Sequence, residues 1–460
     1  MLRSHLLATV FIVCFLNTAL AAASDNCLTG TCHSAILSAK RPHSPATAGD
    51  CLTCHKQRTP QHPTPGKKAF SLVAKGEKLC APCHESPGKG SLAHQPVTDG
   101  ECLSCHRPHG ADGRFLLKNS EDLRALCFSC HDKVPFTKKR IHGPVVTGTC
   151  GTCHDPHRSN FKDLQTGKTN EVCLGCHEDI KKSLTGSPFI HSPIQVSSCV
   201  ACHDPHSSDL LYLAKKKMPD LCFECHKTLQ DQLSKVKNLH RPLTLARGCG
   251  SCHAPHTSNV KKLLNAEEKE LCLSCHGDAS LAPLKNIREE LKGKKNLHGP
   301  IALGRCTGCH DPHGSNTIRL LKGEYPATFY APYTKGVYDF CLRCHEKNLL
   351  RYPDTTVYTK FRNGNRNLHY VHVVDTRKGR TCRVCHEPHA SDGPKLTSSE
   401  GARFGAWKIP FRLKLTETGG SCAAACHPAI GYDRAKPEVY LHTEPSGFGN
   451  TSTTRTGGKE

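Results

Sequence analysis

Apolar residues form one continuous run near the N-terminus and are otherwise scattered singly or in pairs. The run over residues 6–16 is too short to span a bilayer unaided. Arg3 precedes it and small residues follow at 19–23, a pattern typical of a cleaved secretory leader over residues 1–23. An uncleaved anchor and a lipoprotein cysteine at Cys14 are the alternatives. We expect an exported protein, either periplasmic or associated with the outer membrane and the cell exterior.

Beyond residue 23 the pattern predicts only short elements. No segment is long and apolar enough for a membrane-spanning helix, and the segments between cysteine motifs are too short for large sheets. Polar residues at 257–259 and 314–316 resemble helix N-caps and predict short helices after them. Residues 323–372 are rich in aromatic side chains. They could form β-hairpins or a docking surface, and a flap over a bound group is the favoured interpretation. Leucine pairs that could cover a bound group occur at Leu116 and Leu117, Leu263 and Leu264, and Leu320 and Leu321.

The composition leaves little material for a hydrophobic core. The 460 residues include 31 cysteines and 32 histidines but only 2 methionines and 1 tryptophan. Hydrophobic residues make up 37%, cysteines included, which is too little to bury the core of two or three ordinary domains. Cysteine at this density argues against disorder. Disulfides, metal sites or covalent cofactors must therefore supply the core.

The spacing of the cysteines indicates whether disulfides, metal sites or covalent cofactors are present. Apart from Cys14, all cysteines form fifteen pairs, and a histidine directly follows each pair. Thirteen pairs have the form Cys-x-x-Cys-His: Cys51 and Cys54, Cys80 and Cys83, Cys102 and Cys105, Cys127 and Cys130, Cys150 and Cys153, Cys173 and Cys176, Cys199 and Cys202, Cys222 and Cys225, Cys249 and Cys252, Cys272 and Cys275, Cys306 and Cys309, Cys341 and Cys344, and Cys382 and Cys385. Two pairs are expanded: Cys27 and Cys32, and Cys422 and Cys426.

Cys-x-x-Cys-His is the attachment signature of c-type haem. Two thioethers fix one edge of the porphyrin, and the adjacent histidine can then bind the iron. A disulfide framework would not place a histidine after each pair, zinc ribbons do not require one, and a thioredoxin-like site would occur once. For the two expanded motifs, a disulfide is the alternative. The sequence therefore predicts about fifteen covalent haem c groups.

The histidines divide into two sets. Those of the motifs are the expected proximal iron ligands: His33, His55, His84, His106, His131, His154, His177, His203, His226, His253, His276, His310, His345, His386 and His427. Without His5 of the leader, sixteen remain as candidate distal ligands: His43, His62, His94, His109, His142, His157, His191, His206, His240, His256, His298, His313, His369, His372, His389 and His442.

The distal candidates follow a repeat with a period near 50 residues. It contains a haem motif, a His-x-Pro, a second motif and a Pro-His three residues beyond that motif's histidine. Seven repeats begin near residues 27, 80, 127, 173, 222, 272 and 341, and a last motif follows at Cys422. Each repeat thus carries four histidines for two irons. The repetition without a self-sufficient core suggests a quasi-linear array.

The count of histidines predicts two for each iron. Met218 is the only methionine beyond Met1, so methionine ligation is nearly excluded and uniform bis-histidine ligation implies low potentials. The last haem would take His427 and His442. The seventh repeat has one histidine too many, and the choice between His369 and His372 stays open, as does the haem that each distal histidine serves.

These motifs resemble the doubled-CxxCH multihaem cytochromes of respiratory electron transfer. The most specific part is Cys-His-Asp-Pro-His, repeated at His154, His203 and His310. The resemblance implies haems in close pairs and export of respiratory electrons to metals or other extracellular acceptors. We expect mostly coil with short helices wrapped around a covalent haem array, and few short strands in the C-terminal third. Six repeats would occupy residues 24–314, and a C-terminal multihaem region residues 315–460.

The formal charge of +22 is not a nucleic-acid signal. After loss of Arg3, two propionates on each of fifteen haems and one positive charge on each ferric centre would reduce it to about +6. We therefore assign much of the lysine and arginine to neutralising propionates.

Three functions fit these features. The leading one is an electron carrier in anaerobic respiration, not an enzyme, whose partners are quinol-linked or periplasmic cytochromes, an outer-membrane complex or metal oxides. A reductase of nitrogen or sulfur oxyanions would need an iron with an open position. Self-assembly into a cytochrome filament is the third.

Overall fold

The structure is a computed structural model. It describes residues 27–28, 33–62, 65–66, 68–85, 87–119, 122–281, 283–398, 401–424 and 427–440. The expected leader, Cys14, Cys32, Cys426 and His442 lie outside the described residues. The chain forms two compact units, one extending to Lys181 and including Val196–Lys216, the other made of Lys182–Gln195 and the chain from Lys217 onwards. The expected division at residue 315 rests on the repeats and stays a prediction.

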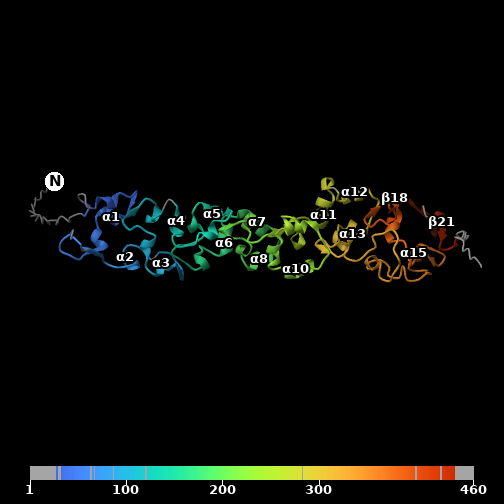
Figure 1. Cartoon of the computed structure of the whole chain (residues 1–460), viewed down its shortest axis with the longest axis horizontal. Coiled ribbons are helices and arrows are strands. Elements are labelled where there is room, and N and C mark those ends of the chain that lie inside the picture. Colours follow the sequence, from blue (N-terminus) through green and yellow to red (C-terminus); the bar gives the residue numbers. More distant parts are fainter. Residues whose placement is uncertain are drawn as a thin grey trace, which may run out of the picture. The chain divides into compact units, whose positions relative to one another are not determined.

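Most helices have only one or two turns, and coil connects them (Figure 1). In chain order they are α1 (Ser44–Ala48), α2 (Glu77–Cys80), α3 (Gln95–Thr98), α4 (Leu123–Cys127), α5 (Gly143–Val146), α6 (Thr169–Leu174), α7 (Glu178–Gly186), α8 (Ser192–Val196), α9 (Asp220–Phe223), α10 (Lys227–Leu233), α11 (Glu268–His276), α12 (Ile287–Leu291), α13 (Gly299–Ala302), α14 (Asp339–Leu342) and α15 (Leu368–Val373). In the described residues, no helix has the length and apolar character needed to cross a membrane.

The strands are shorter still. Those before the C-terminal sheet are β1 (Arg41–Pro42), β2 (His55–Gln57), β3 (Phe70–Leu72), β4 (Leu92–Ala93), β5 (Gly110–Ala111), β6 (Arg140–Ile141), β7 (Arg158–Ser159), β8 (Phe189–Ile190), β9 (Ser207–Ser208), β10 (Asn238–Leu239), β11 (Thr257–Ser258), β12 (Asn296–Leu297), β13 (Gly314–Ser315), β14 (Arg362–Asn363), β15 (Arg366–Asn367) and β16 (Ala390–Ser391). The fold class expected from the sequence is confirmed: coil with short helices, 3-10 turns and short strands.

Short antiparallel pairs join neighbouring repeats. The strand before a His-x-Pro pairs with the strand after the Pro-His of the next repeat: β1 with β5, β4 with β7, β6 with β9, β8 with β11, β10 with β13, and β12 with β16. These pairs occur along most of the described chain, whereas the sequence predicted strands only in its C-terminal third. Two-residue strands leave no periodic hydrophobic signal.

The His-x-Pro element forms because its proline suits the start of a helix. His94 is the N-cap residue of α3, and His142 that of α5, with backbone in the extended region. A proline at the first or second helical position has the φ that the helix needs and lacks only an N–H that would have no partner there. These His-x-Pro histidines are therefore fixed at helix entrances.

The short helices expected after the Pro-His elements are reduced to three-residue 3-10 segments, such as Lys261–Leu263 and Ile318–Leu320, each with a residue of non-helical backbone inside. A strand comes first, and the chain then makes a tight left-handed turn of two residues. Lys262 and Leu263 have φ of 62° and 55°, and Arg319 and Leu320 each have 55°. The same turn occurs at Phe115 and Leu116, Asp163 and Leu164, Tyr212 and Leu213, and Lys395 and Leu396. This conformation costs a non-glycine residue of order 1 kcal/mol, so other contacts must hold it.

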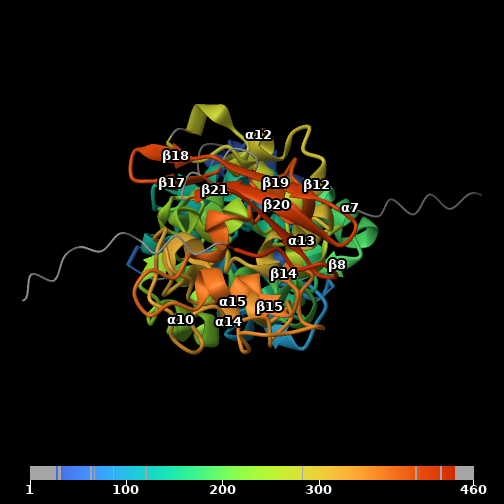
Figure 2. The same ribbon diagram turned by 90° about the vertical axis from the view of Figure 1, so that its right-hand side faces the viewer.

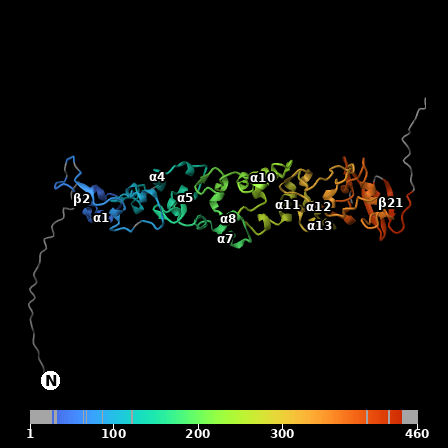
Figure 3. The same cartoon turned by 90° about the horizontal axis from the view of Figure 1, so that it is seen from below.

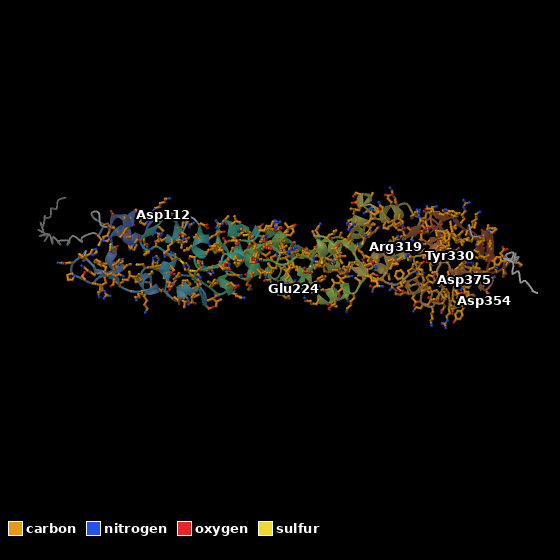
Figure 4. All side chains as sticks on the ribbon, viewed as in Figure 1. Asp112, Glu224, Arg319, Tyr330, Asp354 and Asp375 are labelled. Carbon is orange, nitrogen blue, oxygen red and sulfur yellow. The ribbon has the colours of Figure 1, made fainter. Side chains whose placement is uncertain are left out.

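The polar residues near these turns make bonds between repeats rather than helix caps. Asn316 Oδ1 accepts a hydrogen bond from Lys237 N at 2.9 Å, and Asp112 Oδ1 accepts one from Lys40 N at 3.1 Å (Asp112 is labelled in Figure 4). Ser315 Oγ donates to the carbonyl of Leu321 at 2.6 Å across the left-handed turn. Such bonds close each turn and tie it to the preceding repeat.

The aromatic-rich residues 323–372 and the adjoining Val373 form a small hydrophobic core in the second unit. Tyr338, Leu350 and Val373 are buried there, with Tyr325 and Tyr333 packed against them. The hairpin β14–β15 also lies in this segment. A β-hairpin, one of the alternatives for this segment, is thus present, and several aromatic side chains pack on one another. The favoured interpretation, a flap over a bound group, stays a prediction.

The last strands of the described residues are longer than the others and form a three-stranded sheet. The hairpin of β17 (Ala402–Phe404) and β18 (Trp407–Ile409) precedes the antiparallel sheet β19 (Phe411–Leu415), β20 (Gly419–Ala424) and β21 (His427–Asp433), in that order (Figure 2). Cys422 lies on β20 and His427 begins β21. The last motif therefore has Cys422 and His427 on strands, whereas the motifs from Cys51 to Cys382 begin on helices or 3-10 turns.

Candidate haem-binding sites

The histidine rings face one another in pairs. His94 and His131 have ring centroids 6.0 Å apart and planes 15° from parallel. For the other such pairs the centroid distances run from 5.9 to 6.5 Å. These pairs are His33 with His62, His43 with His84, His55 with His109, His106 with His157, His142 with His177, His154 with His206, His191 with His226, His240 with His276, His253 with His313, His298 with His345, His310 with His389, and His369 with His386.

Most pairs combine histidines from neighbouring repeats. A His-x-Pro histidine faces the first motif of the next repeat, as His94 faces His131. A Pro-His histidine faces the second motif of the previous repeat, as His157 faces His106 rather than His154 of its own motif. Each repeat therefore completes the sites of its neighbours, which the sequence pattern alone did not reveal.

Hydrogen bonds fix which nitrogen of each ring faces its partner. Nδ1 of His94 lies 2.9 Å from the Pro156 carbonyl oxygen, and Nδ1 of His298 lies 3.0 Å from that of Pro388. A carbonyl oxygen only accepts, so Nδ1 carries the proton and Nε2 keeps a free lone pair. The same bond holds for His43, His142, His191 and His240. This tautomer is the one that binds a metal through Nε2.

The left-handed turns fix the tautomer of the motif histidine in the second motif of a repeat, because a turn carbonyl accepts from its Nδ1. His310 Nδ1 lies 2.8 Å from the carbonyl oxygen of Arg319, and His154 Nδ1 lies 2.8 Å from that of Asp163 (Arg319 is labelled in Figure 4). Both acceptors are the first residue of a left-handed turn. The equivalent bonds are made by His106, His203, His253 and His386. The unfavourable backbone conformation thus aims a carbonyl at the motif histidine.

Burial lowers the pKa of several of these imidazoles, among them His298, His310 and His386, and so favours their neutral form. It lowers the pKa of His206, and the adjacent ring of His154 lowers it further. For His369, burial and the neighbouring rings of His386 and His372 lower the pKa to about 4. A neutral imidazole is the form that ligates a metal.

The first cysteines of the two motifs in a repeat touch each other. A hydrogen bond between the Cys127 and Cys150 thiols raises the pKa of Cys127 and lowers that of Cys150 to about 6. The same thiol contact joins Cys27 to Cys51, Cys80 to Cys102, Cys173 to Cys199, Cys222 to Cys249, Cys272 to Cys306, and Cys341 to Cys382. Thioethers at these positions would leave neighbouring attachment points adjacent.

Successive repeats approach through the other cysteines. Cys153 lies near enough to Cys176 for the two thiolates to repel, which adds to the effect of burial in raising the pKa of Cys153. Cys252 and Cys275 are related in the same way. Contacts within a repeat and approaches between repeats therefore alternate.

The residues fit haem c. Two imidazoles bonded to one metal by Nε2 have centroids about 6.2 Å apart, since a metal–nitrogen bond is about 2.0 Å long. The near-parallel pairs meet this condition, and each includes a motif histidine next to two cysteines. Few hydrophobic side chains are buried in the described residues, among them Leu273, Tyr338 and Leu350. Side chains on their own therefore form little core.

A family comparison agrees with this geometry. The model of the doubled CXXCH motif matches residues 43–89, 94–136, 142–182, 191–231, 240–281 and 298–349, which together make up more than half of the chain. The chain belongs to the doubled CXXCH motif family. It is a multihaem c-type cytochrome, and the family implies electron transfer. No curated protein matches the chain.

The family repeat of this cytochrome begins at a His-x-Pro histidine rather than at a motif. The match over 94–136 includes both His94 and His131, which face each other. In this frame one histidine pair lies within each repeat and a second joins it to the next. A repeat counted from a cysteine motif, such as the one that begins at Cys80, therefore starts one motif earlier than the family repeat that begins at His94.

The two C-terminal candidate ligands, His369 and His372, have different neighbours in the structure. His369 faces His386, with planes 15° apart. His372 is not part of that pair. Its Nδ1 lies 2.6 Å from the Leu368 carbonyl oxygen, and burial lowers its pKa, with Arg380 and His427 lowering it further. Both histidines thus lie near motif histidines, and neither is plainly surplus.

His203 and His256 belong to different compact units. The turn carbonyl of Tyr212 accepts from His203 Nδ1 at 2.7 Å. The His256 carbonyl accepts from the backbone N–H of His191 at 2.9 Å. Each thus has the local bonding of its counterparts in the other repeats.

Sequence reasoning did not identify Glu290. Its Oε2 lies 3.3 Å from His389 Nδ1 and 2.7 Å from Lys285 Nζ. Burial raises the pKa of this carboxyl, but the hydrogen bonds with His389 and Lys285 outweigh it and lower the pKa to about 2. The sequence feature that could have indicated this residue is the length of the segment between His276 and His298, which carries Glu290.

Proposed function

We propose that this cytochrome is an electron carrier in which electrons pass between haems held in chain order. Haem iron supplies reversible one-electron oxidation and reduction. The observation that supports the proposal is the alternation of cysteine contacts: Cys127 touches Cys150 within a repeat, and Cys153 approaches Cys176 in the next. The chain thereby keeps successive attachment sites adjacent.

We further propose that each facing histidine pair ligates one iron. The Nδ1 bonds of His94 and His154 to backbone carbonyls hold these rings with Nε2 available, and burial lowers the pKa of His206 and favours its neutral form. Uniform bis-histidine ligation gives low potentials, because imidazole stabilises ferric iron better than a thioether does.

For the last haem we propose His372 and His427 as the ligands. His369 already faces His386, and the His372 Nδ1 bond to Leu368 leaves its Nε2 free. The effect of His427 on the pKa of His372 supports their proximity. His442 would then be the surplus histidine, and the haem count stays at fifteen.

The acceptor lies outside the cell in this proposal. The predicted leader and the family support export, and respiratory electrons would pass to metals or to an outer-membrane partner. Low potentials suit a carrier that receives electrons from quinol-linked cytochromes.

A conductance measurement tests the carrier function. Holoprotein would be bound as a monolayer between two electrodes, beside a variant lacking one internal haem (Cys150→Ala with Cys153→Ala) and one lacking the last haem (Cys422→Ala). The internal deletion should reduce current far more than the terminal one. Equal currents for all three proteins would contradict transfer in chain order. A high-spin ferric signal with turnover of an oxyanion would favour the reductase.

A further inference from the structure

The repeat that begins at Cys272 has a longer segment between its first motif and the next distal histidine, although the two preceding repeats also carry a helix there, α7 and α10. Residues 277–297 separate its first motif from His298, whereas residues 132–141 fill the equivalent place in the repeat at Cys127. The longer segment contains α12, which contacts α11 (Figure 3). Asn286 caps α12 through a bond from Glu289 N to its Oδ1 at 3.1 Å. The insertion is therefore an ordered element.

The helix places a carboxylate against a histidine 99 residues further along the chain. Glu290 Oε2 is 3.3 Å from His389 Nδ1, and only 15% of the Glu290 side chain is exposed. Lys285 Nζ lies 2.7 Å from the same oxygen. Lys285, Glu290 and His389 thus form a chain of polar contacts that ends on a candidate iron ligand.

Two other Pro-His histidines, His157 and His313, make no such hydrogen bond with the carboxylate near them. His157 Nδ1 is 3.8 Å from Asp155, and His313 Nδ1 is 4.0 Å from Asp311, both beyond hydrogen-bond distance. His389 is also unusual in its ring plane. It is tilted 42° from that of His310, whereas His106 and His157 differ by 11°.

We propose that Glu290 is a positioning residue that lowers the potential of the haem held by Cys306 and Cys309. It accepts the Nδ1–H of His389, orients the ring and gives the imidazole anionic character. A more basic imidazole donates more strongly and stabilises ferric iron. Lys285 shares the same oxygen and so weakens this effect. The haem becomes a low-potential step in the carrier.

Opposite shifts in two variants test the proposal. In potentiometric titration of holoprotein, Glu290→Gln should move one haem component to higher potential, because an amide is a weaker acceptor. Lys285→Met should move the same component lower, because the carboxylate then serves His389 alone. Glu289→Gln, on the same helix and 62% exposed, is the matched control and should leave the curve unchanged.

No shift in Glu290→Gln, shifts of one sign in both variants, or an equal shift in the control would overturn the proposal. It rests on the proposed ligation by His389, and His389→Met separates the two. If His389 binds iron, that variant raises one potential whatever Glu290 does. If it leaves every potential in place, His389 is not a ligand and the proposal falls with the ligation, whereas a shift in His389→Met without one in Glu290→Gln overturns the role of Glu290 alone.

Discussion

The Nδ1 atom of His142 lies 2.8 Å from the carbonyl oxygen of Pro205, 63 residues further along the chain. The backbone N–H of His142 also donates to the carbonyl of His206 at 2.9 Å. These two histidines face different motifs, His177 and His154. One short contact between repeats therefore fixes the distal sides of two sites.

Replacing His142 with methionine should alter one haem without detaching it. His142 faces His177, and Cys173 and Cys176 would still form the thioethers. A thioether stabilises ferric iron less than imidazole, so one potential should rise by on the order of 0.1 V within the ~0.8 V range that axial ligands span. Potentiometric titration measures this. Val146→Met adds a methionine at an exposed neighbouring position and should leave the titration unchanged.

The last haem allows a direct comparison of two histidines. His372→Met should raise one potential, because we propose that His372 pairs with His427. His442→Met should behave as wild type. The reverse result, a shift with His442→Met alone, would restore the ligand set expected from the sequence. Electron paramagnetic resonance of the oxidised proteins gives an independent readout, since loss of a ligand would produce a high-spin ferric signal.

The motif chemistry could be predicted from the sequence because a covalent haem needs its cysteines and histidine next to one another. The pairing of distal histidines could not, because His106 and His157 are brought together by strands of two residues. The short helices expected after residues 257–259 and 314–316 are reduced to 3-10 segments for a related reason. Ser315 and Asn316 bond across a turn and to another repeat, and these bonds resemble caps in sequence.

Haem content should be fifteen per chain by pyridine haemochrome and intact mass. The two expanded motifs decide the count, because Cys422 and His427 lie on strands and hold their residues at a different spacing. A mass corresponding to thirteen haems would mean that Cys27 and Cys32, and Cys422 and Cys426, form disulfides instead.

Folding should depend on haem attachment. Few hydrophobic side chains are buried in the described residues, and those around Tyr338 are confined to one segment. The left-handed turns, such as that at Arg319, also need the motif histidine to hold them. Protein made without cytochrome c maturation should be protease-sensitive and lack native circular dichroism. A compact, protease-resistant apoprotein would contradict this.

Asn367 should be among the most sensitive polar residues outside the haem sites. Its side chain is fully buried, caps α15 by accepting from His369 N and Tyr370 N, and donates to two carbonyls, those of Leu349 and Tyr352. Asn367→Ala removes the cap and leaves both acceptors unpaired, at a cost of about 2–4 kcal/mol. Because the cap fixes His369, the loss should also disturb the site with His386.

The measurements for Asn367→Ala are the thermal unfolding temperature and the ferric spin state. We expect a lower unfolding temperature and a partial high-spin signal from one haem. Asn365→Ala, in the same hairpin but exposed, is the matched control and should match wild type in both. A lower unfolding temperature with a fully low-spin spectrum would mean that His369 keeps its position without the cap, and that the cap serves stability alone.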